Sequence, residues 1–407
     1  MENNKALKNS WAMAFTVASV WFGTHVGGGF ASGNQVIVYF AQYGWTSLLY
    51  PIITMGLLAT IMHIMLKFAR LNGFTNYKDT FAALYPDPRM EILFEIFYII
   101  IILAGVAAAV AGAGEVMANF LGITYVGAAK VLCNLVIVAL LVVLSIFGVK
   151  VVAAASSVLS VAIMIITAMI VVAGLVAAAD GDVARQLSRY GLEAMPYTPA
   201  PLKAVWRGIF VYAAFQCVSI SPMIAASQEM GTTGTRRACI LGWLMNGLAL
   251  GLSGYMLSKW YPLLAAMKEA GVEGFQNATG IPNQTVLTII GLKWLLVIFS
   301  VLLFCAFVST CVTLIFTMVQ RFQSKLAQFD ADGVVVGGIK NERVRSIIVA
   351  LITIALCFAI SLLGLTKITT ILYGYDGYYA LVVVVLPAFI WGIPKIRKLE
   401  AEGKTAA

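Results

Sequence analysis

The sequence predicts an all-α integral membrane protein, and two observations carry that prediction. Apolar residues make up 61% of the chain and charged residues only 11%, whereas soluble domains contain about 45–50% and about 25% of these classes. The apolar residues gather in long runs, and about 20 such residues suffice to cross the hydrocarbon core of a bilayer. We therefore expect a single polytopic bundle over residues 1–407 and no separate aqueous domain.

Ten apolar segments are long enough to be transmembrane helices. They cover Trp11 to Gln42, Thr46 to Ala69, Glu91 to Asn119, Val126 to Phe147, Val151 to Ala179, Leu202 to Gln228, Ala238 to Trp260, Thr285 to Gln320, Ser346 to Gly364 and Ile368 to Ile393. The first run is far longer than the apolar part of a signal peptide, so we expect the N-terminus to be retained.

The net charge is +9, and the distribution of the basic residues along the chain fits a membrane topology. With the N-terminus in the cytoplasm, two thirds of the 27 lysines and arginines fall on the cytoplasmic side, as the positive-inside rule requires. An even number of spans then places the C-terminus there too. The charge therefore indicates no nucleic-acid partner, and the lipid bilayer is the expected environment.

The six cysteines lie in apolar runs and include no C-x-x-C pair. Neither a disulfide framework nor a zinc site is indicated by that pattern. We expect them to be small core residues.

The first segment contains a glycine-rich stretch from Gly23 to Gly33 at its middle. Three consecutive glycines, Gly27 to Gly29, cost about 3 kcal/mol relative to alanine if they stay helical. We therefore predict an interruption, and unwound backbone at membrane depth is tolerated only where it lines a cavity or binds something. The alternative is close helix packing through the small residues of Gly29-x-x-x-Gly33.

The sixth segment carries a second break signal between Phe215 and Pro222. Proline removes a helical hydrogen bond and crowds the preceding turn, so a simple kink is one reading. The position of this break signal, in the sixth segment, favours a second reading. Interruptions in the first and sixth of ten helices are typical of two five-helix halves repeated with inverted topology, here about residues 11–179 and 202–393, with the binding site at the breaks.

This organisation resembles the amino acid–polyamine–organocation (APC) superfamily and its LeuT-like five-plus-five inverted repeat. More narrowly, Val26 to Gly33, followed by Asn34 and an apolar run ending in Phe40, is similar to the YkvI family of bacterial membrane proteins. That family reads closer to V-G-A-G-F-A-S-G-Q-E, whereas this chain has Asn34-Gln35 in place of Gln-Glu. The resemblance implies a permease of the bacterial inner membrane with both termini in the cytoplasm.

The resemblance also implies a sodium site. LeuT-type sodium symporters hold one ion between the broken part of helix 1 and helix 8 with carbonyl and hydroxyl oxygens, and unwound carbonyls suit such an ion. On this sequence the ligands become the carbonyls of Gly23, Val26 and Ala306 and the hydroxyls of Ser309 and Thr310. Hydroxyls bonded to their own helix are the alternative. No other cofactor is expected.

The substrate is expected beside the ion, with an anionic end facing the amides that begin the second half of the first helix. A small carboxylate-bearing solute such as an amino acid fits best. The residues expected to bind it are Thr24, His25, Gly27, Gly28, Gly29, Phe215, Ser219 and Ser221.

Burying an ionisable residue inside a membrane span costs free energy, so such residues are candidates for function. Glu115 lies towards the outer end of the third segment and Asp376 in the outer half of the tenth, with Arg207, Lys130 and Lys293 as possible partners. Gating or proton transfer is one role for Glu115, Asp376 and Arg207. A stabilising ion pair is the other.

These features together predict a secondary active transporter, a symporter driven by sodium. A proton-coupled permease and an amino-acid receptor of the same fold, as in germination permease-like subunits, are the alternatives. An enzyme is not expected: Gly251 to Gly254 matches the G-x-S-G pattern of rhomboid proteases, but the only histidines, His25 and His63, lie in the first two segments, and a nucleophilic serine needs a base within reach. The oligomeric state stays open.

Overall fold

The computed structural model describes residues 10–147, 149–199, 201–329 and 335–404, and it is helical almost throughout. Nine helices in these ranges are long and apolar enough to cross a membrane. The first predicted segment is not among them because its longest helix, α2 (Trp11–His25), has 15 residues. The chain is therefore an all-α, multi-pass membrane protein, with nine continuous spans and one divided segment in the described ranges.

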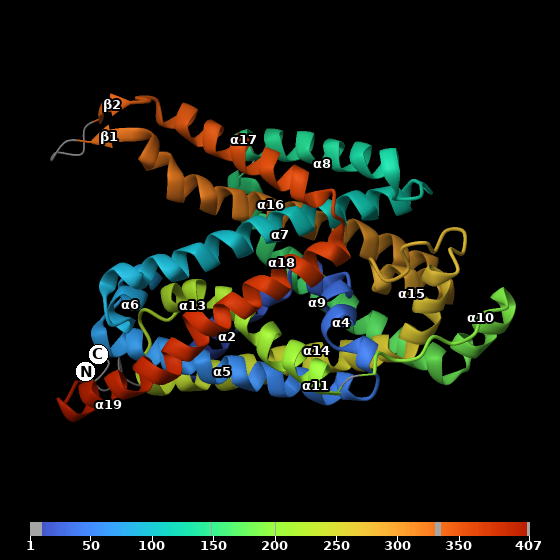
Figure 1. Cartoon of the computed structure of the whole chain (residues 1–407), viewed down its shortest axis with the longest axis horizontal. Coiled ribbons are helices and arrows are strands. Elements are labelled where there is room, and N and C mark those ends of the chain that lie inside the picture. Colours follow the sequence, from blue (N-terminus) through green and yellow to red (C-terminus); the bar gives the residue numbers. More distant parts are fainter. Residues whose placement is uncertain (1–9, 148, 200, 330–334, 405–407) are drawn as a thin grey trace.

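The helices form two layers that face each other (Figure 1). One layer holds α7 (Glu91–Phe120), α8 (Gly127–Phe147), α16 (Lys293–Phe322) and α17 (Glu342–Ser361), and the other holds α2, α5 (Thr46–Asn72) and α14 (Thr232–Glu269). Between them, α9 (Val149–Ala179) contacts α16 and α14, and α18 (Leu365–Ala380) contacts α7 and α12 (Tyr212–Phe215). The buried residues in the middle therefore come from both layers.

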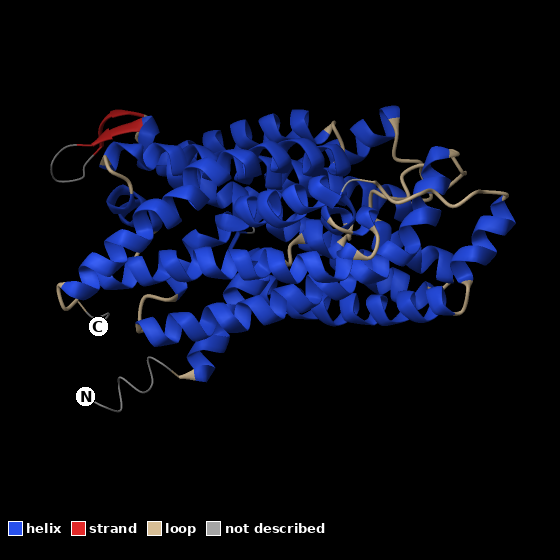
Figure 2. Cartoon of the chain, turned by 60° about the horizontal axis from the view of Figure 1, so that its bottom comes forward, coloured by secondary structure: helices blue, strands red, loops and turns tan. Residues whose placement is uncertain are grey.

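The two ends of the bundle differ. Both chain termini lie at one end, together with the antiparallel hairpin of β1 (Ala327–Phe329) and β2 (Val335–Gly338), red in Figure 2. The helices α10 (Asp182–Tyr190) and α15 (Pro282–Ile290) lie at the opposite end (Figure 1). We call these the terminal end and the loop end. The number of crossings and the side of the membrane on which the termini lie stay predictions.

The first segment is interrupted where its glycines predict it. After α2, Val26 leaves helical geometry (φ −81°, ψ 55°) and Gly27 is extended (ψ −178°). The chain then forms α3 (Gly28–Ala31) and α4 (Asn34–Tyr39), separated by Gly33 at φ 84°, a left-handed conformation that favours glycine. The interruption is thus confirmed, and a second one follows seven residues later.

The sixth segment departs from α geometry more mildly. It runs through α11 (Pro201–Ala204), a π-helical stretch (Val205–Val211), α12, a 3₁₀ turn (Gln216–Ser219) and α13 (Ile220–Ala226). Pro222 lies in the first turn of α13, where its missing N–H leaves no helical bond unmade. The predicted break is therefore a tightened turn and not unwound backbone.

The remaining elements connect or extend the spans. They are α6 (Tyr77–Leu84), the short 3₁₀ turns at Ala41–Tyr43, Pro88–Met90 and Gln323–Leu326, two π-helical stretches at Leu381–Val385 and Ala388–Gly392, and α19 (Ile393–Ala401). One predicted boundary is wrong. Thr285 belongs to the separate helix α15, which Gly291 ends at φ 80°, and the eighth span begins at Lys293.

Candidate functional site

The break in the first segment lies against α16. A Cβ placed on Gly27 would be 4.0 Å from the Thr310 hydroxyl oxygen. Ala306 and Ser309 lie on the same helix and are buried. The structure thus brings the break next to one of the two proposed hydroxyl ligands. The sodium site formed by Gly23, Val26, Ala306, Ser309 and Thr310 stays a prediction.

The break exposes backbone amides at the start of α3. The first bonded amides of this turn are those of Phe30 and Ala31, both of which donate to the Gly27 carbonyl. Gly28 and Gly29 precede them and carry no side chain beyond a hydrogen. Together with the amide of Gly27, these two amides are the ones predicted from the sequence to bind a carboxylate.

A feature that the sequence did not reveal is the Phe307 side chain of α16. A Cβ built on Gly28 would lie 2.2 Å from the Phe307 ring, and one built on Gly112 of α7 would lie 2.3 Å from it. The ring is therefore held between two glycines. For Gly28 the packing alternative is observed, because only a residue without a side chain admits the ring.

Replacing Gly28 by alanine is expected to destabilise the protein. The added methyl overlaps the Phe307 ring, and overpacking of this kind costs about 1–3 kcal/mol. Gly247 in α14 is the matched control: its Cβ would meet nothing closer than 3.5 Å, so alanine there should stabilise the helix by about 1 kcal/mol. Thermal unfolding of the purified variants measures both. A Gly28→Ala protein as stable as wild type would contradict the close packing.

His25 belongs to a buried hydrogen-bonded network. Its Nδ1 lies 2.7 Å from the Asn246 side-chain oxygen and its Nε2 lies 2.9 Å from the Tyr212 hydroxyl, which is also 3.3 Å from the Gln35 side-chain oxygen. The Asn246 amide nitrogen donates to the Gly242 carbonyl, so its oxygen accepts from Nδ1. Both ring nitrogens are engaged, and His25 therefore ties the end of α2 to α14 and α12, whereas its role in substrate binding stays a prediction.

Thr24 lies at the end of α2, and its predicted role in substrate binding stays a prediction. Its side chain is exposed and its hydroxyl donates to the Val20 carbonyl one turn back, at 2.8 Å. Such bonds satisfy the hydroxyl within its own helix. The structure thus gives Thr24 no contact of its own at the break.

The sixth segment contributes an aromatic cluster. The Phe215 ring lies 4.8 Å from that of Tyr212, 5.4 Å from Tyr39 and 5.3 Å from Tyr373, measured between centroids. Ser219 in the following 3₁₀ turn is fully buried, with no hydrogen-bond partner for its hydroxyl among the described residues. That turn packs against α2, whereas Ser221, two residues on, is half-buried. The two interrupted segments therefore lie side by side.

The ionisable residues do not form the ion pairs that we considered. Arg207 donates to the Thr370 carbonyl at 3.3 Å and lies over the Tyr39 ring. Neither carboxylate oxygen of Asp376 has a hydrogen-bond partner in the described part of the chain. The hydroxyl of Tyr373, one turn before Asp376 on α18, would lie 3.6 Å from a Cβ built on Gly105 of α7. The placement of Asp376 in the outer half of its span stays a prediction.

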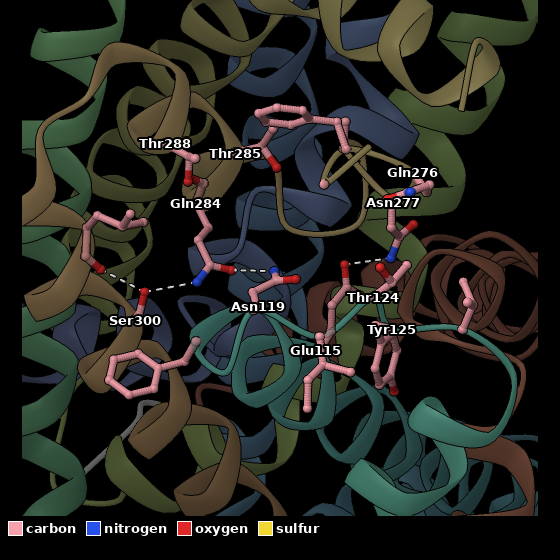
Figure 3. Close-up of a pocket in the computed structure, with 18 of the residues that line it drawn as sticks. Glu115, Asn119, Thr124, Tyr125, Gln276, Asn277, Gln284, Thr285, Thr288 and Ser300 are labelled. Carbon is pink, nitrogen blue, oxygen red and sulfur yellow. Dashed lines mark hydrogen bonds between the residues drawn. The ribbon is translucent and has the colours of Figure 1, made fainter. Parts of the chain in front are cut away.

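Glu115 lines a cavity of about 450 Å³ at the loop end (Figure 3). One of its oxygens accepts from the Asn277 amide at 2.5 Å, and the other is buried without a partner in the described residues. Across the cavity, Asn119 donates to Gln284, which donates to Ser300. The lining comes from α7, α15, α16 and the connections 122–126 and 274–278, so this cavity is separate from the break in the first segment. Lys130 and Lys293 are not among its lining residues.

The connection before α15 is fastened to the first segment. The Asn34 amide donates to the carbonyls of Thr279 and Gly280 and to the Thr366 hydroxyl, and Asn283 donates to the carbonyls of Ala31 and Ser32. These bonds hold the loop end closed over α3 and α4. Asn34, where the family pattern has glutamine, thus has a structural role that its sequence position did not show.

The terminal end is held by a buried ion pair between Glu95 of α7 and Arg321 of α16. The Arg321 guanidinium also lies over the rings of Tyr77 and Tyr98, 5.1 and 4.8 Å from their centroids. Burial raises the pKa of the Tyr77 hydroxyl, so it stays protonated and donates to Glu95. This cluster joins α6 to both helices.

Comparison with known proteins identifies the fold. No protein-family model matches the chain, and no curated protein matches it by sequence. The substrate-bound outward-open structure of a Na+-coupled sialic acid symporter is similar over 93% of this chain and 79% of that chain, with a TM-score of 0.57 and 13% identity. The chain has a LeuT-like transporter fold.

Two further structures share the LeuT-like fold. The manganese transporter of Eremococcus coleocola gives a TM-score of 0.55 at 16% identity, over 93% of this chain and 78% of that one. MhsT in complex with L-phenylalanine gives 0.54 at 13% identity, over 94% of each chain. The predicted all-α, LeuT-like fold class is thus confirmed, whereas the count of ten spans and membership of the YkvI family stay predictions.

Proposed function

We propose that the protein is a secondary active transporter that couples a small carboxylate-bearing solute, such as an amino acid, to sodium. The observation that carries this proposal is the interrupted first segment at Val26 and Gly27, which lies against Thr310 of α16. Interrupted membrane helices supply carbonyls to a cation and amide dipoles to an anion in transporters of this architecture. The 3₁₀ turn that departs from α geometry in the sixth segment packs against α2.

The substrate would lie where the two interruptions meet. The Gly28 and Gly29 amides would face its carboxylate, since they stand at the positive end of a helical turn, and Gly27 would leave the approach open. Phe215, Ser219 and Ser221 would contribute an apolar ring and hydroxyls from the other segment. Similar structures include a Na+-coupled symporter and MhsT in complex with L-phenylalanine, which supports both the ion and the substrate class.

Uptake by the purified protein in liposomes tests the proposal. With an imposed sodium gradient and a panel of radiolabelled amino acids, we expect accumulation of at least one of them and none when sodium is replaced by choline. Amino-acid binding without accumulation would support the receptor alternative. Accumulation driven equally by a proton gradient in sodium-free buffer would support a proton-coupled permease.

A further inference from the structure

We propose that Asp376 is a proton-binding site of the transport cycle, reached from the loop end along one polar face of α18. The inference rests on the proposed transport function and adds a proton to the sodium ion as a coupling cation. It assigns a role to a carboxyl group that the sodium and substrate sites leave unused.

The first ground is the isolation of the Asp376 carboxylate. The residue is 3% exposed, and neither oxygen has a hydrogen-bond partner in the described ranges. Next to it, α18 packs tightly on the sixth segment: a Cβ on Gly377 would lie 2.6 Å from the Val211 carbonyl oxygen. The carboxyl group is therefore enclosed by packed helices, without a hydrogen bond from the described residues.

The cationic groups that could neutralise Asp376 are exposed or bonded elsewhere. The charged or titratable side chains on α18 and on the elements packed against it are Lys367, Tyr373, Tyr375, Tyr378 and Tyr379 on α18, Glu91, Glu95, Tyr98 and Glu115 on α7, Tyr39 on α4, Arg207 and Tyr212 on the sixth segment, and Glu342, Arg343, Arg345 and Cys357 on α17. Of the cations, Lys367 and Arg343 are exposed, and Arg345 donates to the Ile339 carbonyl. Arg207 donates to the Thr370 carbonyl, Tyr39 to Thr369 and Tyr379 to Leu93. Glu95 is paired with Arg321.

The remaining groups of that set do not supply a counter-charge either. Glu115 is bonded to Asn277, Tyr212 to His25 and Cys357 to the Leu103 carbonyl. An ionised carboxylate enclosed at membrane depth without a partner costs several kcal/mol. A bound proton removes that cost and needs no shell of ligands, whereas an ammonium group or a metal ion requires several acceptor oxygens around it. The geometry thus favours a proton.

The second ground is the polar face of α18 that leads to Asp376. Thr366, Thr369, Tyr373 and Asp376 are spaced by three, four and three residues, which places them on one side of a helix. The Thr366 hydroxyl accepts from Asn34 at the loop end, and the Thr369 hydroxyl is buried without a partner in the described ranges. Hydroxyl groups therefore extend from the closed loop end to the carboxyl group, a path suited to proton transfer when the loop opens.

The protonation state is tested directly by infrared spectroscopy of the full-length protein in liposomes. We expect a carboxylic-acid carbonyl band at neutral pH in the wild type that is reduced in Asp376→Asn. The variant preserves the shape of a protonated aspartate and should fold normally. Asp180→Asn, at an exposed position, is the matched control and should leave the band unchanged. An equal band in wild type and Asp376→Asn would overturn the proposal.

Proton movement is tested with a trapped pH-sensitive dye in the same vesicles. For an amino acid of the panel that the wild type transports, we expect its addition to acidify the lumen in the wild type and not in Asp376→Asn. The variant should still exchange labelled for unlabelled amino acid, because exchange needs no net proton release. Equal acidification in both proteins, or uptake by the wild type without acidification, would overturn proton coupling while leaving the transport function standing. Absence of any uptake would instead contradict the proposed function, and the infrared comparison would still decide whether Asp376 holds a proton.

Discussion

Replacing Ser309 and Thr310 together by alanine is expected to weaken sodium-dependent uptake strongly. The double variant removes both hydroxyl ligands of the proposed sodium site and leaves only the carbonyls of Gly23, Val26 and Ala306. We expect the sodium concentration for half-maximal uptake to rise at least tenfold, which corresponds to about 1.4 kcal/mol of binding free energy. Uptake measured against sodium concentration in liposomes gives this number.

The control for this prediction is Thr317→Ala on the same helix. The Thr317 hydroxyl donates to the Thr313 carbonyl one turn back at 3.0 Å and is exposed, so its removal should not change the sodium dependence. Wild-type sodium dependence in the Ser309→Ala and Thr310→Ala double variant would show that the ion binds elsewhere. Substrate binding in sodium-free buffer separates loss of the ion site from loss of folding.

Replacing Glu95 by glutamine is expected to destabilise the protein strongly. The Glu95 and Arg321 side chains are only 10% and 8% exposed, and breaking a buried ion pair costs about 3–5 kcal/mol because one charge stays buried without its partner. The loss should also free α6 from α7 and α16 at the terminal end, since Tyr77 donates to the same carboxylate. Thermal unfolding reports the first effect, and the accessibility of a cysteine introduced into α6 reports the second.

Glu400 provides the matched control for the ion pair. It pairs with Lys67 at 2.7 Å, but the two side chains are 47% and 24% exposed, and such surface pairs contribute about 0–1 kcal/mol. Glu400→Gln should therefore unfold near the wild-type temperature. Equal stabilities of Glu95→Gln and Glu400→Gln would contradict a structural role for the buried pair.

Sequence reasoning located the break in the first segment because the cause is local. Three adjacent glycines oppose helix wherever they stand, and the structure interrupts the helix at Val26 and Gly27. The proline of the sixth segment was a weaker signal. Pro222 lies in the first turn of α13, where proline is compatible with a helix. The 3₁₀ turn that precedes it, Gln216–Ser219, was therefore seen only in the three-dimensional structure.

The roles of His25 and Asp376 could not be derived from the sequence. His25 finds Asn246 and Tyr212 at separations of 221 and 187 residues, and nothing in the local pattern names those partners. Asp376 looked like a possible partner of Arg207, yet the guanidinium reaches a backbone carbonyl instead. Small rotations of a helix decide such pairings, because they select which side chains face each other.

The membrane class, the approximate spans and the place of the first interruption could be predicted from the sequence, because composition, run length and glycine content act within one segment. The side chains that pack against the glycines are known only from the three-dimensional structure. Phe307 fills the space between Gly28 and Gly112, Asn34 fastens the loop before α15, and Arg321 meets Glu95. These contacts depend on how helices far apart in the chain are packed, and packing selects partners by shape and charge in three dimensions rather than by order along the chain.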